Sequence, residues 1–378
     1  MNDMFFVAYP AAILLIALIG VKVAAKGEFR KDFLGLSTAK NIQGIAAMFI
    51  ILHHLVQEIS NFAAVDRGPI TIFNGLGVIF TGLYFFYSGY GLYTSMEQKP
   101  DYFAHFFRNR LSTVLIPFYV NIFVSIAMIH PLDHPYSGGA GLWILYILGL
   151  VLYNHQTWYI VEICILYVAF YLIFKNEKKR AIGMIRMSAV VIIMIAVSLL
   201  LGHNRYVEWG AIWFMGEWWY NATGMFLVGL FVAINRKKVT EVAQKFYGIL
   251  LPMSGFLFVV SYFVRTAVQA KHGYWTETFN NPAYDDKLIA YLSEVPMIFL
   301  FGVFIVLLTM KVQFDNKVIR FLGKHTLEIY ISQIVFLTIF PHRIKSEFLF
   351  FGAVYACTIL LAFFVHKLDA WLIKKVKI

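Results

Sequence analysis

Residues 41–60 read NIQGIAAMFIILHHLVQEIS, a stretch long and apolar enough to cross a bilayer as one helix. It nevertheless carries two adjacent histidines, His53 and His54, followed by Gln57 and Glu58. Ionisable residues inside a membrane helix are costly, and those that occur usually face the protein interior or a functional cavity. The stretch therefore predicts a membrane protein with a polar site inside it.

The composition extends this prediction to the whole chain. Of its 378 residues, 60% are hydrophobic and only 14% are charged, well below the roughly 25% that is typical of soluble domains. A further apolar run, residues 142–153, is too short to cross and predicts a re-entrant or interfacial helix. The expected fold is an all-α polytopic membrane protein with eleven spanning helices, near residues 5–23, 42–60, 76–95, 112–130, 157–174, 187–201, 218–234, 246–264, 291–310, 325–341 and 348–366.

The basic residues are distributed unevenly between alternate loops. Of the 32 Lys and Arg residues, 25 fall in one set of loops and seven in the other. Because cytoplasmic loops carry an excess of Lys and Arg, the N-terminus is expected outside and the C-terminus in the cytoplasm. Cleavage of a signal peptide after Ala25 would leave the basic segment KGEFRKDF outside, so we expect a retained first helix. Membrane topology thus accounts for the net charge of +11, and no nucleic-acid partner is expected.

The chain is expected to form one membrane domain, since no segment rich in Ser, Gly or Pro divides it. Its predicted parts are an N-terminal helix with a cytoplasmic loop (1–34), the membrane domain (35–366) and a basic cytoplasmic tail (367–378). Two outer segments, 202–217 and 265–290, are rich in Trp, Tyr, Asn and acidic residues. They either line a mouth that binds sugar or form an aromatic belt at the interface.

The polar residues of the 41–60 stretch suit proton transfer. On a helix, His54 and Glu58 share one face, as do His53 and Gln57. A carboxylate one turn away fixes the tautomer of the imidazole and stabilises its protonated form, which suits a general base. The alternative is a buried polar pair that only links helices. The sequence shows no spacing of metal ligands, so neither a metal site nor a permanently bound cofactor is expected.

Five short motifs, in this order, resemble those of the integral-membrane acyltransferase 3 family, whose members O-acylate cell-surface polysaccharides, peptidoglycan and antibiotics. They are IQGIAAMFIILHH (42–54), GLYFFYSGYGLYTS (82–95), FFRNRLSTVLIPFY (106–119), TWYIVEICILYVAFYLIF (157–174) and LGKHTLEIYISQ (322–333). The resemblance covers roughly residues 35–366. It implies a ten-span acyltransferase core, with the first helix as an addition.

The resemblance also implies roles for residues. His54, assisted by Glu58, would deprotonate an acceptor hydroxyl, while groups near the cytoplasmic face would hold the phosphates of an acyl-CoA donor, namely Lys40, Gln43, Arg108 and Arg110. The cavity would be lined by His53, Tyr87, Ser88, Trp158, Glu162 and Gln333, with Tyr87, Ser88 and Trp158 as candidate oxyanion donors. Three positions depart from the family pattern: Gln43 replaces a basic residue, Thr113 an arginine and Gln333 a late histidine.

The expected function is O-acyl transfer in a bacterial plasma (inner) membrane. Cytoplasmic acyl-CoA, in the simplest case acetyl-CoA, would donate its acyl group to a hydroxyl of an extracytoplasmic carbohydrate or surface polymer. One alternative is a transporter or flippase with a His54–Glu58 proton relay, although the paired broken helices of such proteins are not evident. Another is a catalytically altered family member that acts as a partner of a surface-polymer assembly machine.

Overall fold

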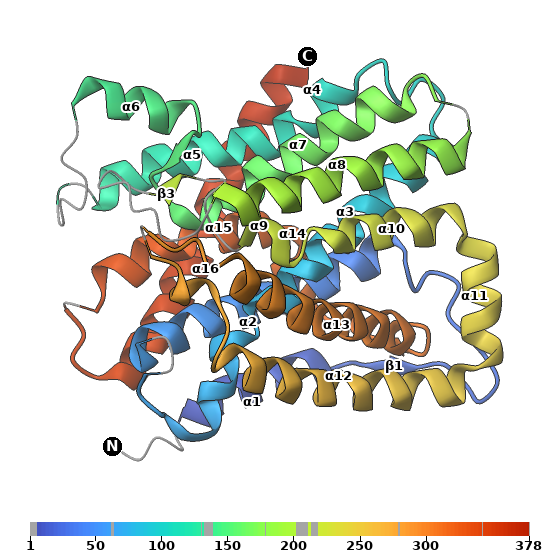
Figure 1. Cartoon of the computed structure of the whole chain (residues 1–378), viewed down its shortest axis with the longest axis horizontal. Helices are drawn as coiled ribbons and strands as arrows, with labels where there is room; N and C mark the ends of the chain where they lie inside the picture. Colours follow the sequence, from blue (N-terminus) through green and yellow to red (C-terminus); the bar gives the residue numbers. More distant parts are fainter. Residues whose placement is uncertain are drawn as a thin grey trace.

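The computed structural model describes residues 6–61, 64–129, 131, 139–177, 179–201, 211–212, 218–278, 280–341 and 343–377. These residues form a bundle of helices with two very short antiparallel strand pairs (Figure 1). The expectation of an all-α membrane protein is therefore confirmed for the described part of the chain.

Among the described residues, eight helical segments are long and apolar enough to cross a membrane. They are α2 (Leu36–Ser60), η2 with α3 (Gly68–Gly75 and Gly77–Gln98), α5 (Ser112–Ile129), η3 with α7 (His155–Thr157 and Trp158–Phe174), α8 (Arg180–Leu201), α12 (Tyr247–Gln269), α13 (Tyr284–Thr309) and α16 (Glu347–Lys377). The other three predicted spans contain the shorter apolar helices α1 (Ala8–Leu18), α10 (Gly224–Ile234) and α15 (Thr326–Ile339).

The remaining elements are short and connect these helices. They are β1 (Lys22–Val23), α4 (Phe106–Arg110), α6 (Ala140–Ile147), β2 (Val151–Leu152), β3 (Ala211–Ile212), α9 (Trp218–Asn221), α11 (Arg236–Lys245), η5 (Tyr274–Thr276), β4 (Val312–Gln313) and α14 (Lys317–Lys324). Two predicted segments differ from the structure. Helices α12 and α13 extend into the outer segment 265–290, and α16 continues through most of the predicted tail. The other outer segment, 202–217, lies outside the described residues apart from β3.

Contacts between loops divide them into the two sides that alternating spans require. β1 pairs with β4, and Arg180 forms an ion pair with Glu97 at 2.7 Å; all four of these segments belong to the predicted basic side. On the opposite side, β2 pairs with β3, and Arg67 contacts Glu347 at 2.7 Å. The contacts thus agree with the alternation of spans, and the charge bias predicts that the basic side faces the cytoplasm.

Helix α2 lies in the middle of the bundle, where it contacts α1, α3, α14, α15 and α16. Most of its residues are buried, whereas α12 leaves most of its apolar side chains exposed. In a membrane, an apolar exposed helix is one that faces lipid, and an apolar buried helix belongs to the core. The middle of α2, with His53 and His54, is therefore placed inside the protein, whereas Lys40 and Glu58 near its two ends are exposed.

Glycines let two pairs of helices approach to backbone contact. A Cβ atom at Gly44 of α2 would lie 2.5 Å from the main-chain nitrogen of Gly323 in α14. Gly89 of α3 and Gly229 of α10 meet the backbone of each other's helices in the same way. Small residues stabilise helix pairs in membranes because they permit this close approach. Gly44, Gly89 and Gly323 all belong to the motifs quoted above.

The predicted short segment 142–153 forms α6 and then a buried stretch without a helix. Residues 151–154 are buried, and the Asn154 amide donates to Oδ1 of Asn121 in the middle of α5 at 2.7 Å. It also donates to the main-chain carbonyl of Ile331 in the middle of α15 at 2.8 Å. Irregular backbone is tolerated at this depth only where protein surrounds it. The stretch thus enters the bundle between α5 and α15.

Candidate functional site

The polar site centres on a hydrogen bond between α2 and α15. Nδ1 of His54 lies 3.1 Å from Oε1 of Gln333, whose side chain is fully buried. The amide nitrogen of Gln333 donates in turn to the main-chain carbonyl of Tyr330 at 2.8 Å. The carbonyl needs a donor, so the amide nitrogen faces Tyr330 and the amide oxygen faces His54.

This arrangement determines which nitrogen of His54 carries the proton. Because Oε1 of Gln333 only accepts hydrogen bonds, Nδ1 of the neutral imidazole is the protonated nitrogen. Nε2 then keeps its lone pair and is the nitrogen that can accept a proton from a substrate. The uncharged amide of Gln333 therefore fixes the tautomer of His54, the candidate base.

The neighbouring His53 is held differently. Its Nδ1 lies 2.9 Å from the main-chain carbonyl of Phe73 in η2, and its ring lies against Gly77, where any Cβ atom would collide with it. The two imidazole centroids are 5.0 Å apart. Packing against Gly77 places the Nε2 edge of His53 on the start of α3, where the ring fills the space beside the glycine.

Glu58 lies one helical turn beyond His54, and its side chain is exposed. The sequence places the two side chains on the same face of α2, but the hydrogen bond of His54 Nδ1 goes to Gln333. Any assistance from Glu58 would therefore come from its charge rather than from fixing the tautomer.

Three tyrosines lie on the side of Gln333 that faces the basic end of the bundle. The ring centroids of Tyr84, Tyr159 and Tyr330 are separated by 5.9–6.2 Å. The Tyr84 hydroxyl donates to the main-chain carbonyl of Gln43 at 3.0 Å. Since Gln43 and His54 are eleven residues apart on one helix, about 16 Å, the tyrosines occupy the level between these two residues.

Glu162 of α7 borders the same cluster. It is fully buried, and one carboxylate oxygen accepts a hydrogen bond from Thr223, next to α10. The other oxygen has no hydrogen-bond partner among the described residues. Tyr159 lies three residues before Glu162 on α7, and its ring centroid is 6.0 Å from that of Tyr330. The structure thus brings Glu162 into the interior near the tyrosines.

No group of His, Cys, Asp and Glu side chains in the described part of the chain has the arrangement of a metal site.

The three candidate oxyanion donors are not placed together. Tyr87 follows Gly77, which contacts His53, by ten residues on α3, so it lies about 15 Å further toward the basic side. Its buried hydroxyl has no partner among the described residues, whereas the hydroxyls of Ser88 and Tyr167 lie 2.9 Å apart. Trp158 is half-buried and packs against Phe85 and Tyr159. Tyr87 and Ser88 therefore lie near the level of Gln43 rather than beside His54.

The candidate donor-binding residues lie at the basic end. Lys40 and Arg108 are exposed, and the Lys40 carbonyl is 2.5 Å from the Cβ position of Gly323, which places Lys324 next to it. Arg110 instead donates to the hydroxyls of Ser95 at 2.8 Å and Tyr102 at 3.1 Å.

Both partners of Arg110 are uncharged hydroxyl groups, so neither of them neutralises the positive charge of the guanidinium. Burial raises the pKa of the Tyr102 phenol, so the phenol stays neutral near pH 7 and accepts the hydrogen bond of the guanidinium. Lys40 and Arg108 are exposed and Arg110 is half-buried, so all three positive charges lie at the basic end of the bundle.

Two asparagines support the site, and the sequence analysis did not identify them. Asn121 and Asn154 are both buried, and both donate to the Ile331 carbonyl, two residues before Gln333. They attach α5 and the non-helical stretch around Asn154 to α15, the helix that carries Gln333. An asparagine inside an apolar run such as IPFYVNIFV is itself a sequence signal, because lipid penalises polar groups.

Comparison with known proteins adds one match. The family model described as an acyltransferase domain matches residues 40–367, most of the chain. No curated protein and no solved structure matches the chain. The matched range contains His54, Gln333, the three tyrosines and the candidate donor-binding residues.

Proposed function

The chain belongs to the acyltransferase 3 family, and from this premise we propose that it transfers an acyl group from acyl-CoA to a hydroxyl of a carbohydrate or surface polymer across the membrane. As a family member it is an acyltransferase of the EC 2.3.1 type, with several helices long enough to span a bilayer. The finer assignments that follow are the donor, the acceptor, the topology and the roles of residues.

The hydrogen bond between His54 and Gln333 carries the proposal. It leaves Nε2 of His54 with a lone pair inside a buried region, the state that a general base needs to act on a neutral hydroxyl. Glu58, one turn away, would stabilise the imidazolium that forms during the reaction. Gln333 replaces the late histidine of the family pattern, and its amide still provides an acceptor for Nδ1.

The reaction then follows from ordinary acyl-transfer chemistry. The acceptor oxygen attacks the carbonyl carbon of the thioester while its proton passes to Nε2 of His54. The C–S bond breaks, and the CoA sulfur leaves with the proton that His54 returns. An ester of the acceptor and free CoA are the products.

The donor would enter from the basic side, which the charge bias assigns to the cytoplasm of a bacterial plasma membrane. Lys40, Arg108 and Arg110 would attract its phosphates, because positive potential and N–H donors favour them. From the level of Gln43, the pantetheine arm would pass the hydroxyls of Tyr84 and Tyr87 to bring the thioester to His54. Acetyl-CoA is the simplest donor, and an acceptor from the opposite side would meet it there.

The test is acyl transfer in membranes. Radiolabelled acetyl-CoA is added to inverted membrane vesicles that contain the wild type or the His54→Ala variant at equal levels, and label in envelope carbohydrate is counted. His53→Ala is the matched control, since it removes the adjacent imidazole. We expect His54→Ala to lose about 10²- to 10⁴-fold in rate, the usual contribution of a general base.

The result separates the candidate functions. Label that depends on His54 but survives His53→Ala supports the proposal. Equal label with the wild type and His54→Ala would place the base elsewhere. If no label exceeds an empty-vector control with acetyl-CoA or longer acyl-CoAs, the role as a partner in surface-polymer assembly gains support.

A further inference from the structure

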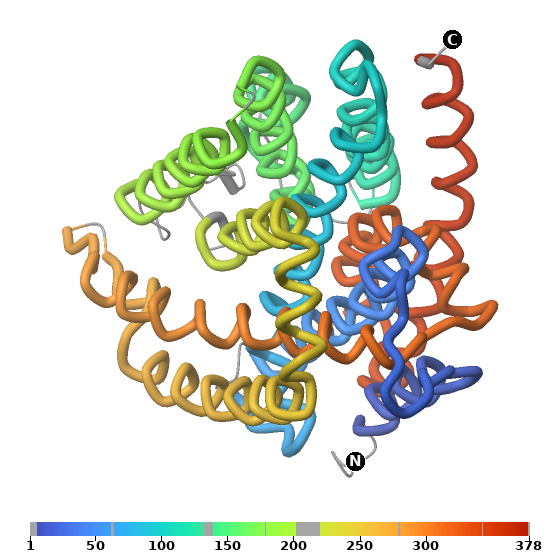
Figure 2. Tube along the Cα trace, turned by 90° about the vertical axis from the view of Figure 1, so that its right-hand side faces the viewer, coloured from blue at the N-terminus to red at the C-terminus, as the bar shows by residue number. Residues whose placement is uncertain are grey.

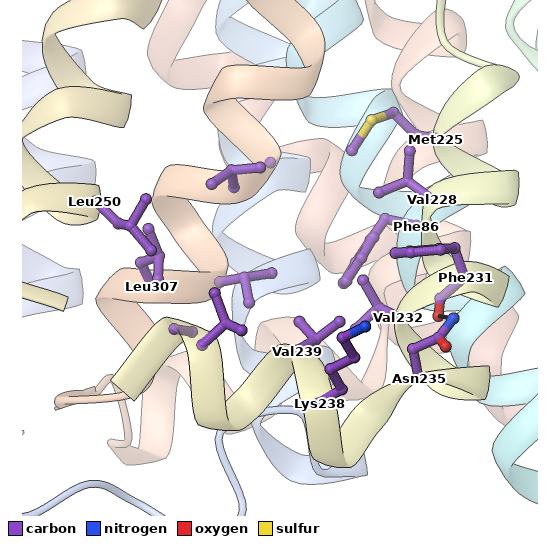
Figure 3. A pocket seen from close by; sticks show the side chains of 15 residues that line it. Phe86, Met225, Val228, Phe231, Val232, Asn235, Lys238, Val239, Leu250 and Leu307 are labelled. Atoms are coloured by element: carbon purple, nitrogen blue, oxygen red, sulfur yellow. Dashed lines mark hydrogen bonds between the residues drawn. The ribbon is translucent and has the colours of Figure 1, made fainter. Parts of the chain in front are cut away.

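A pocket of about 480 Å³ lies outside the site, between α3, α10, α11, α12 and α13 (Figure 3). Its walls are apolar side chains such as Phe86, Met225, Val303 and Leu307. Two polar residues, Asn235 and Lys238, lie at the end where α10 meets α11. None of the residues placed in the catalytic or donor-binding machinery lines it.

The walls of this pocket select an apolar occupant. Its volume falls in the range of about 300–1,000 Å³ that small-molecule sites occupy. Water is stable in a cavity only where two to four polar partners hold it, and these walls do not supply them. The neighbouring α12 exposes Phe256 and Phe263, as expected of a helix in contact with lipid. A hydrocarbon chain from the bilayer therefore matches the pocket.

Helix α11 closes the pocket at the basic side of the bundle. It crosses the ends of the spanning helices rather than running parallel to them (Figures 1 and 2). Val239 and Val242 line the pocket, while Arg236, Lys237 and Lys245 are exposed. A helix with one apolar face and one basic face is typical of the membrane interface. Phospholipid headgroups lie at this level.

The charge at the mouth selects an anionic headgroup. Arg236, Lys237 and Lys238 are consecutive, all three are exposed, and the Lys238 side chain extends along the pocket in Figure 3. No ion pair among the described residues neutralises these three side chains. Clusters of Lys and Arg next to a membrane attract anionic lipids. The Asn235 amide nitrogen donates one hydrogen to the Phe231 carbonyl at 3.0 Å and keeps its second hydrogen for a phosphate oxygen.

We propose that this pocket binds one anionic phospholipid of the leaflet on the basic side. One acyl chain occupies the apolar pocket, and the phosphate lies at Lys238 and Asn235. The bound lipid would link α11 to both the α10–α3 pair and the α12–α13 pair. The site does not depend on acyl transfer.

The experiment is native mass spectrometry of the purified full chain, titrated with phosphatidylglycerol or phosphatidylcholine carrying identical acyl chains. The variants are Lys238→Gln, which removes the one of the three mouth charges that lines the pocket, and Val306→Phe, which fills the pocket. The matched controls are Lys245→Gln on the same helix and Val259→Phe on the exposed face of α12. Circular dichroism confirms that each variant is folded.

We expect one site that prefers phosphatidylglycerol by about fivefold or more, as one lysine near an anionic headgroup provides. Lys238→Gln removes this preference, Val306→Phe weakens both lipids, and the controls change neither. Equal affinity for the two headgroups in the wild type would overturn the proposal and indicate ordinary surrounding lipid. The same conclusion follows if Lys245→Gln weakens binding as much as Lys238→Gln. If Val306→Phe does not fold, the headgroup comparison with Lys238→Gln still decides.

Discussion

His54 and Gln333 are hydrogen-bonded at 3.1 Å, although 279 positions separate them in the chain. The bond joins α2 to α15 and determines the tautomer of the imidazole. A glutamine cannot take up a proton, so Gln333 orients the imidazole through its hydrogen bond alone. Any charge that stabilises the imidazolium comes from other residues.

Gln333→Ala is expected to lower kcat about 10- to 100-fold, the usual effect of removing a group that orients a functional histidine. KM for the acyl donor should change little, because the candidate donor-binding residue Lys40 lies near the opposite end of α2 from His54. Initial rates of acyl transfer across a range of acetyl-CoA concentrations provide both constants. Gln244→Ala, at an exposed position of α11, is the control. An unchanged kcat in Gln333→Ala would show that the tautomer is set by another group.

Glu58→Gln is expected to have a smaller effect, about fivefold on kcat. An exposed carboxylate interacts with a charge by no more than about 1 kcal/mol, and salt screens it. The measurement is the same assay at low and high salt, where added salt should reduce the wild-type rate toward that of the variant. A loss as large as that of His54→Ala would instead assign Glu58 a direct part in proton transfer.

The sequence predicted the elements of the fold better than the partners of the site. Apolar runs locate helices directly, and each of the eleven contains an apolar helix in the structure. Helical periodicity states that His54 and Glu58 share a face, but it contains no information about the neighbouring helix that faces them. The family resemblance suggested that Gln333 lines the cavity, but its hydrogen bond to His54 follows only from the packing of α15 on α2.

The sequence also does not predict how far two neighbouring helices are shifted relative to each other along their axes. Tyr87 and Ser88 were expected to serve the oxyanion, but the contact of His53 with Gly77 places them about 15 Å toward the basic side. Asn121 was within reach of sequence reasoning, since a polar amide in an apolar span requires a buried partner. Its partner Asn154 lies in a non-helical stretch, and no local sequence pattern specifies how deeply that stretch enters the bundle.

Gly44→Ala is expected to destabilise the protein by about 1–3 kcal/mol, because the new methyl group would overlap the backbone of Gly323 and neither helix can give way. Gly91→Ala is the matched control: it lies in α3, and nothing is within 4 Å of its Cβ position. Alanine is the better helix former, so this control should be neutral or stabilising by up to about 1 kcal/mol. Thermal unfolding in detergent measures both. Similar melting temperatures for the two variants would contradict the close packing of α2 on α14.

Asn154→Ala is expected to cost about 1–3 kcal/mol, because Oδ1 of Asn121 loses its donor in a buried environment. Asn121→Ala should cost a similar amount, and the double variant less than the sum, since the residues share a bond and the Ile331 carbonyl. Thermal unfolding of the single and double variants gives the coupling, with exposed Asn109→Ala as control. Strict additivity would mean that the two asparagines act independently.

Arg108→Gln is expected to raise KM for acetyl-CoA about fivefold, the value of one exposed ionic contact, while kcat remains near that of the wild type. Contacts to the phosphates are equally strong in the ground state and the transition state, so they affect KM and not the rate of the chemical step. Arg110→Gln should raise KM too and also lower stability, because Ser95 and Tyr102 lose their donor.

Acetyl-pantetheine distinguishes phosphate binding from a general weakening of Arg108→Gln and Arg110→Gln, because it carries the thioester without the nucleotide phosphates. If the arginines hold phosphates, both variants should match the wild type with acetyl-pantetheine and fall behind only with acetyl-CoA. Lys271→Gln, a basic residue on the predicted outer side, should change neither substrate. Since screening weakens exposed ionic contacts, added salt should raise KM of the wild type for acetyl-CoA more than that of Arg108→Gln. A variant that is equally impaired with both thioesters would indicate that its arginine maintains the local structure and does not contact the phosphates of the donor.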